Sequence, residues 1–361
     1  MKFKSIISII TVLITAFSLC LFTGCQDEEA EQPEEMIDYE IALITDDGLI
    51  NDHGTSEAVW NTLTDFGSSK GISHKYYKAT QAKANAVREV LDTAVDKGAK
   101  IVVVDNSSIA NVVFKLQKKY EDIDFVTINT DPYEPEFGDI LIKENTAAIT
   151  FATEQAGYLA GYAAVSEGYT QLGCLVENSD QQMKNYLYGF AKGANRAAME
   201  RGETVKLRRY VCDLKGTVRK TAAEKADKWY REGTEVIFVC GDKIEDVVIE
   251  EAESHDGKVI AGITDKGEVS DTVIISAVVN IDLALKETLD AYLDQKFPGG
   301  EVLEYGIAED AVGLDYQNSR LKHFDKAQYD ALYEQIKSGD IRIKVKDIEN
   351  VQDLELENIE L

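Results

Sequence analysis

A buried-strand pattern followed by polar residues opens the body of the chain. The run 41–44 is uninterrupted and apolar, which is typical of a strand buried on both faces. Three polar residues and a glycine follow at 45–48, and a helical pattern begins at Thr55. The polar groups therefore stand at the carboxyl end of a strand, where open parallel sheets bind ligands. The alternative is that Asp46, Asp47 and the glycine after them only form a turn and cap the helix.

An alternation of short apolar runs and amphipathic stretches continues through the first half of the chain. Each apolar run has the length of a strand, and each amphipathic stretch carries apolar residues at helical spacing. The predicted strands are 74–79, 101–104, 125–128 and 140–142, and the predicted helices are 82–97, 109–120 and 150–168. Strands that alternate with helices predict a doubly wound parallel sheet.

The second half of the chain repeats this organisation and predicts a second α/β domain. Its expected strands are 172–176, 207–211, 236–240, 259–263, 273–279, 302–307 and 312–314, and its expected helices are 179–201, 217–231, 246–253, 282–293 and 324–338. The acidic end, residues 346–361, is expected to hold a short strand and a loose tail. The predicted fold class is α/β, with two doubly wound parallel-sheet lobes joined by a hinge.

The predicted helix 150–168 is rich in small residues, among them Gly157 and Gly161 at a spacing of four. Such a pair brings helices close together inside membranes. Glu154 and Glu167 interrupt the segment, so we do not interpret it as a membrane span. We expect the glycines to allow close packing of this helix on the sheet.

Polar residues gather where the predicted strands end. The carboxyl ends of parallel strands meet at one edge of a sheet, and two lobes with such edges can close on a ligand by hinge motion. We therefore expect a ligand cleft between the lobes. Its polar residues are Asp46 and Asp47, Asp105 and Asn106, Asn129 to Asp131, Gly241 and Asp242, and Thr264 and Asp265.

The first 25 residues have the character of a targeting segment. Two lysines precede an uncharged, mostly apolar run, which ends in Phe-Thr-Gly-Cys at Cys25. This resembles the signal of a bacterial lipoprotein, in which the cysteine becomes the lipidated first residue. The resemblance implies a signal peptide at 1–24, a lipid on Cys25, an acidic disordered linker at 25–37 and a body at the extracytoplasmic face of the cell membrane. The alternative is an uncleaved membrane anchor.

The formal net charge of −27 argues against partners that reward basic surfaces. Nucleic acid is such a partner, and docking on anionic lipid is disfavoured for the same reason. Cys174, Cys212 and Cys240 lie in apolar, strand-like runs without CxxC or metal-ligand spacing. We expect buried thiols there, with a single disulfide as the alternative.

Five segments, taken in order, resemble the basic membrane protein family of bacterial substrate-binding lipoproteins. They are LITDDGLINDHGTSEAVW at 43–60, ENTAAITFATEQAGYLAGYAA at 144–164, NYLYGFAKGA at 185–194, VIFVCGD at 236–242 and SAVVNIDLAL at 276–285. The best-known members bind purine nucleosides for ABC importers. The resemblance implies the type I periplasmic-binding fold, with a first lobe of 38–148 plus about 279–305 and a second lobe of 149–278 plus about 306–345.

The same resemblance assigns ligand-binding roles to positions of this sequence. In the family an aspartate lies near the ligand, an aromatic residue and an asparagine hold the base, and further groups come from both lobes. The corresponding residues here are Asp46, Thr55, Ser56, Asn129, Tyr186, Gly241 and either Thr264 or Asp265, and the family's lysine falls on Val279. Asp47, Asp105 and Asp242, at strand ends, complete the predicted ligand site.

Several of these positions depart from the family's pattern. Thr55 and Ser56 replace the aromatic–asparagine pair, so a base would stack on Tyr186 alone, at a loss of roughly 0.5–1.5 kcal/mol. Asn129 and Val279 both lack the charge that the family has there. The predicted ligand is therefore a small polar molecule, with nucleoside-like compounds first. The candidates for a replacement stacking surface are His53, Trp60 and Tyr133, and the alternative for each is packing or solvent exposure.

The predicted function is that of a solute-binding protein which presents its ligand to the permease of an ABC importer. An enzyme is a second interpretation, but the sequence has no GxSxG, HExxH, P-loop or GxGxxG motif and its four histidines are scattered. The aspartates after the first strand lack the spacing of a calcium loop. We expect no catalysis, cofactor or metal. The third interpretation is a ligand sensor or surface-interaction lipoprotein of the same fold, without a transport role.

Overall fold

The computed structural model describes residues 38–45, 50, 53–81, 84–105, 107–132, 140–178, 181–213, 216–345 and 348–361. They belong to one compact unit, Asp38–Leu361. The predicted signal peptide, Cys25 and the linker at 25–37 lie outside the described residues, as do Asp46 and Asp47. Among the described helices, none combines the length and the apolar character needed to cross a bilayer.

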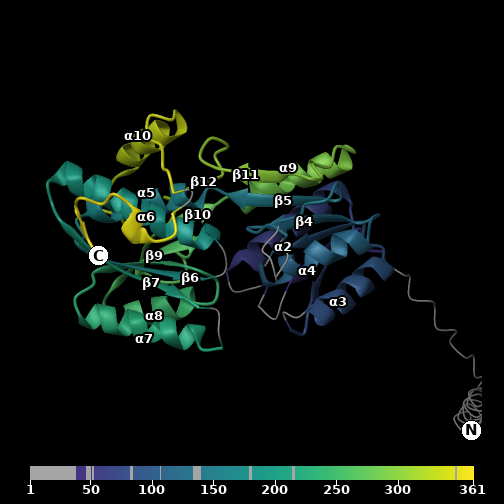
Figure 1. The fold of residues 1–361 in the computed structure, drawn as a ribbon, viewed down its shortest axis with the longest axis horizontal. Helices are drawn as coiled ribbons and strands as arrows, with labels where there is room; N and C mark the ends of the chain where they lie inside the picture. Colours follow the sequence, from purple (N-terminus) through teal and green to yellow (C-terminus); the bar gives the residue numbers. More distant parts are fainter. Residues whose placement is uncertain are drawn as a thin grey trace, which may run out of the picture. The chain divides into compact units, whose positions relative to one another are not determined.

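Six parallel strands form the sheet of the first lobe (Figure 1). From edge to edge they are β11 (Val302–Tyr305), β5 (Thr146–Phe151), β4 (Asp124–Ile128), β3 (Ile101–Val104), β1 (Ile41–Thr45) and β2 (His74–Lys78). Successive residues of β1 point to opposite faces, so Ile41 and Leu43 join one apolar cluster while Ala42 and Ile44 join another. The helices that cover the first face are α2 (Thr55–Lys70) and α9 (Ile281–Leu293), and those on the second are α3 (Ala84–Asp96) and α4 (Ser107–Lys119).

Seven strands form the sheet of the second lobe. From edge to edge they are β12 (Val312–Asp315), β10 (Val273–Val279), β9 (Lys258–Ile263), β8 (Val236–Cys240), β6 (Gln171–Glu177), β7 (Val205–Cys212) and β13 (Ile359–Glu360). All pairs are parallel except that of β12 with β10. The helices on one face are α5 (Thr153–Glu167) and α6 (Gln181–Arg201), those on the other are α7 (Val218–Arg231) and α8 (Glu245–His255), and α10 (Lys326–Lys337) packs beside α5. The predicted fold class is confirmed.

The chain passes between the two sheets three times, at Ala152, at Asn280 and within residues 306–311. The expected crossings are near 148, 278 and 300–310. β5 pairs with β11 as far as Phe151. The lobe boundary expected after residue 148 therefore falls inside a strand of the first sheet, and the first lobe extends three residues further before the chain crosses.

The secondary-structure prediction is wrong between residues 140 and 153. The sequence pattern predicts a strand at 140–142 and a helix from 150, whereas the structure has one bridge residue at Ile140, a strand over Thr146–Phe151 and a helix from Thr153. The strand β5 reads TAAITF, and its alanines favour a helix over a strand. All of its residues are buried between β4 and β11, and this tertiary packing overrides the local preference.

The small residues of α5 serve a helix–helix contact, not the predicted contact of helix and sheet. A Cβ atom added at Gly157 would lie 2.2 Å from the carbonyl oxygen of Tyr186, a residue of α6. A Cβ atom added at Gly193 of α6 would lie 1.9 Å from the carbonyl oxygen of Tyr158 on α5. The two helices therefore touch backbone to backbone, which only glycine permits at these positions.

The acidic end of the chain packs on the second lobe. Val351 and Leu354 are buried, and the hydroxyl of Tyr188 donates a hydrogen bond of 2.8 Å to the carbonyl of Glu349. β13 then extends the sheet beside β7. The predicted short strand is confirmed, and the predicted loose tail is wrong for residues 348–361, because their apolar side chains have a core to join.

Cys174, Cys212 and Cys240 are buried and free, as predicted. Burial in the core raises the pKa of each thiol above its ordinary value. The reactive thiolate is therefore scarce near neutral pH, and the three cysteines act as small apolar side chains.

Candidate functional site

The first turn of α2 carries two predicted site residues, and one of them reaches the second lobe. Thr55 is buried, and its backbone N–H donates a hydrogen bond to Oδ1 of Asp242 at 3.3 Å. The hydroxyl of Ser56 lies 3.2 Å from the hydroxyl of Thr45, at the end of β1. The backbone N–H of Thr55 thus reaches the region between the lobes, while Ser56 contacts the end of β1 inside the first lobe.

The strand ends of β3 and β4 place further predicted residues at the same edge of the first sheet. Asp105 follows β3 and is buried. Asn129 follows β4 with a φ of 61°, a conformation that asparagine tolerates better than most residues. Oδ1 of Asn129 and Oδ1 of Asp131 are both buried, and neither has a hydrogen-bond partner among the described residues. Burial, and next to it the charge of Glu304, raises the pKa of Asp131.

The turn after β8 depends on the glycine that was predicted there. Gly241 has a φ of 137°, and an added Cβ would lie 2.3 Å from Cγ of Glu177. Glu177 is buried at the end of β6, and its Oε1 accepts a hydrogen bond of 2.7 Å from the backbone N–H of Lys243. The compact turn leaves Asp242 exposed toward the first lobe, where it accepts the hydrogen bond from Thr55.

The residues after β9 divide between contacts inside the second lobe and contacts across to the first. Asp265 accepts hydrogen bonds of 2.7 Å from the hydroxyl of Ser276 and from Nδ2 of Asn318, both in the second lobe. The hydroxyl of Thr264 instead donates to the backbone carbonyl of His53, at 2.7 Å. Of the two residues that the resemblance left open, Thr264 therefore makes the contact between the lobes.

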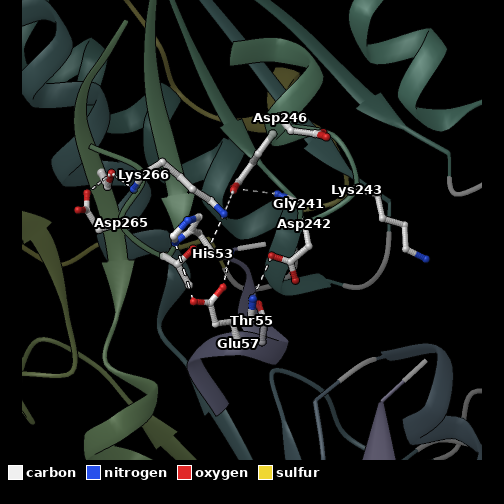
Figure 2. Close-up of polar contacts among 12 residues, drawn as sticks. His53, Thr55, Glu57, Gly241, Asp242, Lys243, Asp246, Asp265 and Lys266 are labelled. Carbon is white, nitrogen blue, oxygen red and sulfur yellow. Dashed lines mark hydrogen bonds and ion pairs between the residues drawn. The ribbon is translucent and has the colours of Figure 1, made fainter. Parts of the chain in front are cut away.

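Lys266 and Glu245 belong to the same region and are missing from the predicted site. Nζ of Lys266 donates to the backbone carbonyl of His53 at 2.5 Å (Figure 2). The same Nζ lies 3.6 Å from Oε2 of Glu245. Lys266 is only 6% exposed and Glu245 only 2%. Burial raises the pKa of Glu245 to about 8, and the nearby ammonium of Lys266 opposes that rise. Burial thus favours the protonated form of the Glu245 carboxyl, and Lys266 favours the carboxylate.

Tyr186 lies in the core of the second lobe. It is fully buried on α6, and its ring meets that of Phe238 edge to face at 5.9 Å between centroids. Burial raises the pKa of its hydroxyl well above the ordinary value. In this arrangement the ring of Tyr186 is part of the apolar core of the second lobe.

The remaining predicted surfaces have different surroundings. The ring of Trp60 packs against His74 and Tyr76, with centroid distances of 5.5 and 5.1 Å, which agrees with the packing alternative. His53 is exposed, and Tyr133 and Asn106 lie outside the described residues. Val279, at the position of the family's lysine, is buried at the end of β10 and lines a pocket of about 740 Å³ beside the crossing segments.

Comparisons with known proteins agree with this architecture. A family model described as "ABC transporter substrate-binding protein PnrA-like" matches residues 40–351. The chain is 22% identical over 350 residues to the ABC transporter nucleoside-binding protein BmpA of Lactococcus lactis subsp. cremoris, covering 88% of this chain and 94% of the relative. It is 23% identical over 323 residues to the transcriptional activator protein med of Bacillus subtilis, covering 85% and 93%. A solved solute-binding protein of an Aeropyrum pernix ABC transporter system superposes with a TM-score of 0.70 at 13% identity, covering 85% and 94%.

Proposed function

This chain belongs to the PnrA-like Bmp family of ABC transporter substrate-binding proteins, and we propose that it binds a small polar, nucleoside-like ligand between its two lobes. The family resemblance predicted from the sequence is confirmed by the match over most of the chain. The family consists of substrate-binding proteins, not enzymes. A permease partner and a lipid anchor on Cys25 are parts of this proposal and rest on the sequence and on the family.

The observation that carries the proposal is the meeting of strand-end polar groups from both sheets. Two hydrogen bonds join the start of α2 in the first lobe to strand ends of the second lobe. They run from Thr55 to Asp242 and from Lys266 to His53. Ligands of open α/β sheets bind at this edge, and hinge closure brings two such edges together.

Unpartnered acceptors in the first lobe favour a ligand rich in hydrogen-bond donors. Oδ1 of Asn129 and Oδ1 of Asp131 are buried without a described partner, and such groups are costly unless something binds them. The hydroxyls and exocyclic amines of a nucleoside are suitable donors. The name of the Lactococcus relative supports the same class. Val279 stands where the family has its lysine, and the ammonium of the buried Lys266 holds the carbonyl of His53.

A thermal-shift screen of the purified protein with nucleosides, bases, sugars and amino acids tests the ligand class. A ligand at about 100 times its dissociation constant should stabilise the protein by about 2.7 kcal/mol. We expect a purine nucleoside to give the shift. A shift with another class would overturn the nucleoside assignment, and no shift with any compound would count against the binding function itself.

Replacing Asn129 by glycine tests where the ligand sits. Asn129→Gly removes the carboxamide and still allows the positive φ of 61°. We expect a loss of affinity of roughly tenfold, as for one lost hydrogen bond of about 1.4 kcal/mol. Gln295→Gly is the matched control, because Gln295 also has a positive φ, of 58°, and lies exposed after α9. Equal affinities in the two variants would refute this placement.

The site also limits which substitution of Tyr186 is informative. Tyr186→Ala would open a cavity in the core and cost roughly 3–5 kcal/mol of stability, so lost binding in that variant would not distinguish a lost ligand contact from unfolding. Tyr186→Phe keeps the volume and removes only the hydroxyl. A change in ligand affinity in that variant would place the hydroxyl in the site.

A sensor without a transport role is the second candidate, and one comparison favours it. The Bacillus subtilis relative, which aligns with 85% of this chain, is named a transcriptional activator. Deleting the gene of this protein discriminates between the two. Loss of uptake of the bound ligand would support transport, whereas normal uptake with an altered transcriptional response would support sensing.

A further inference from the structure

Three metal-binding side chains converge on the outer helices of the second lobe, on α7 and on the last turns of α8, whereas Glu245 is the first residue of α8. Asp227 comes from α7, and Glu251 and His255 come from α8. Nε2 of His255 lies 3.0 Å from Oδ1 of Asp227 and 3.9 Å from Oε2 of Glu251. The three ligand atoms all lie within 4.8 Å of one another, and all three residues are half-buried, so an ion from solution can reach them.

The imidazole of His255 is held in the orientation that this convergence requires. Its ring stacks on Tyr230, with centroids 6.0 Å apart and 26° between the planes. Tyr230 is itself fixed, because its hydroxyl donates a hydrogen bond of 2.8 Å to the carbonyl of Lys258. Glu251 and His255 are one helical turn apart on α8, and α7 packs directly on α8. The donor atoms thus sit on a rigid helix pair.

The spacing of the donor atoms suits a tetrahedral zinc ion. Zinc binds imidazole nitrogen and carboxylate oxygen at about 2.0–2.2 Å, so neighbouring ligand atoms in a tetrahedral site lie about 3.4 Å apart. The observed separations of 3.0 and 3.9 Å lie on either side of this value. One neutral nitrogen and two carboxylates would also balance the charge of the ion. We propose that Asp227, Glu251 and His255 form a zinc-binding site with one coordination position open to solvent.

Arg231 shapes this site and also weakens it. Its guanidinium pairs with Oδ2 of Asp227, which leaves Oδ1 directed at His255. A carboxylate oriented by a second hydrogen bond is a common support for a metal ligand. The positive charge of Arg231 opposes the ion, so we expect binding at micromolar zinc, weaker than in sites with a complete protein ligand set. The histidine and Glu251 are four residues apart, but Asp227 is on another helix, which is why sequence spacing does not reveal the site.

Titration of the purified protein with zinc tests the proposal. The protein is first treated with a chelator and then titrated with Zn²⁺ in competition with a chromophoric zinc indicator. We expect one ion per chain, and His255→Gln should weaken binding by roughly tenfold or more, since even the outer support of a zinc ligand is worth 10–100-fold. His323→Gln is the matched control, because His323 lies before α10, away from this cluster. It should bind zinc as the wild type does.

The alternative explanation of the cluster is an ion pair between a protonated His255 and the two carboxylates. In that case the wild type would bind no zinc in the micromolar range, or His255→Gln would bind as well as the wild type, and either result overturns the proposal. Glu251→Gln provides a second variant if His255→Gln fails to fold, and it should also weaken zinc binding. Zinc is the only probe, so the result is independent of the ligand proposed for the lobes.

Discussion

Replacing Lys266 by methionine removes a charged hydrogen bond that joins the two lobes. Nζ of Lys266 donates to the carbonyl of His53 at 2.5 Å, and methionine keeps most of the buried volume without the charge. Burial already raises the pKa of Glu245, and loss of the ammonium raises it further, so this carboxyl shifts toward its neutral form in the variant.

The magnitude follows from the type of bond that is lost. A hydrogen bond with one charged partner contributes roughly 1.5–3 kcal/mol. The joined arrangement should lose this amount relative to the open one, which lowers the ratio of joined to open molecules by roughly 10- to 140-fold. The remaining contacts, from Thr264 to His53 and from Thr55 to Asp242, are neutral or long and replace little of it.

Hydrogen exchange at the start of α2 measures this change directly. The N–H of Thr55 donates across to Asp242, so its protection reports whether the lobes are joined. We expect the N–H of Thr55 to exchange roughly 10- to 140-fold faster in Lys266→Met. Lys286→Met is the control, because Lys286 forms an ion pair with Asp282 inside one helix. Unchanged exchange at Thr55 in Lys266→Met, or an equal change in Lys286→Met, would refute the reasoning.

Two further predictions concern packing and pH. Gly193→Ala should destabilise the protein by about 1–3 kcal/mol in chemical denaturation, because the new methyl group would lie 1.9 Å from the carbonyl oxygen of Tyr158. Gly216→Ala is the control and should be neutral, because its methyl group would meet nothing within 4 Å. Equal stabilities of the two variants would contradict the contact between α5 and α6. Burial raises the pKa of Glu154 to about 7 from 4.5. The stability of the wild type should therefore fall by about 3 kcal/mol relative to that of Glu154→Gln as pH rises from 4.5 to 7. A difference in stability between the two proteins that does not change with pH would contradict this prediction.

The fold could be predicted from the sequence because the apolar pattern and the topology agree for most of the chain. The run 41–44 is apolar at every position, and the structure uses both faces of it, one against α2 and one against α3. The prediction fails at β5, where alanines favour a helix and only the neighbouring strands make the segment extended. Local preference misleads where tertiary burial decides the conformation.

Only part of the candidate site could be predicted from the sequence. Strand-end residues such as Asp105, Asn129 and Gly241 follow from topology alone, since parallel strands end at one edge. Lys266 could not be found in this way, because its function comes from burial beside Glu245 and from a carbonyl more than 200 residues away in sequence. Tyr186, a position taken from the family, is a fully buried core side chain here, so its role in binding stays a prediction.

The contacts between the lobes also constrain how a ligand would gain its affinity. The carbonyl of His53 and the carboxylate of Asp242 accept hydrogen bonds from residues of the opposite lobe. A ligand that leaves these contacts intact gains its binding energy from other groups, such as the acceptors of Asn129 and Asp131. Apparent affinity scales with the fraction of molecules already in the competent arrangement. Lys266→Met should consequently weaken ligand binding without touching the ligand, once that fraction falls well below one.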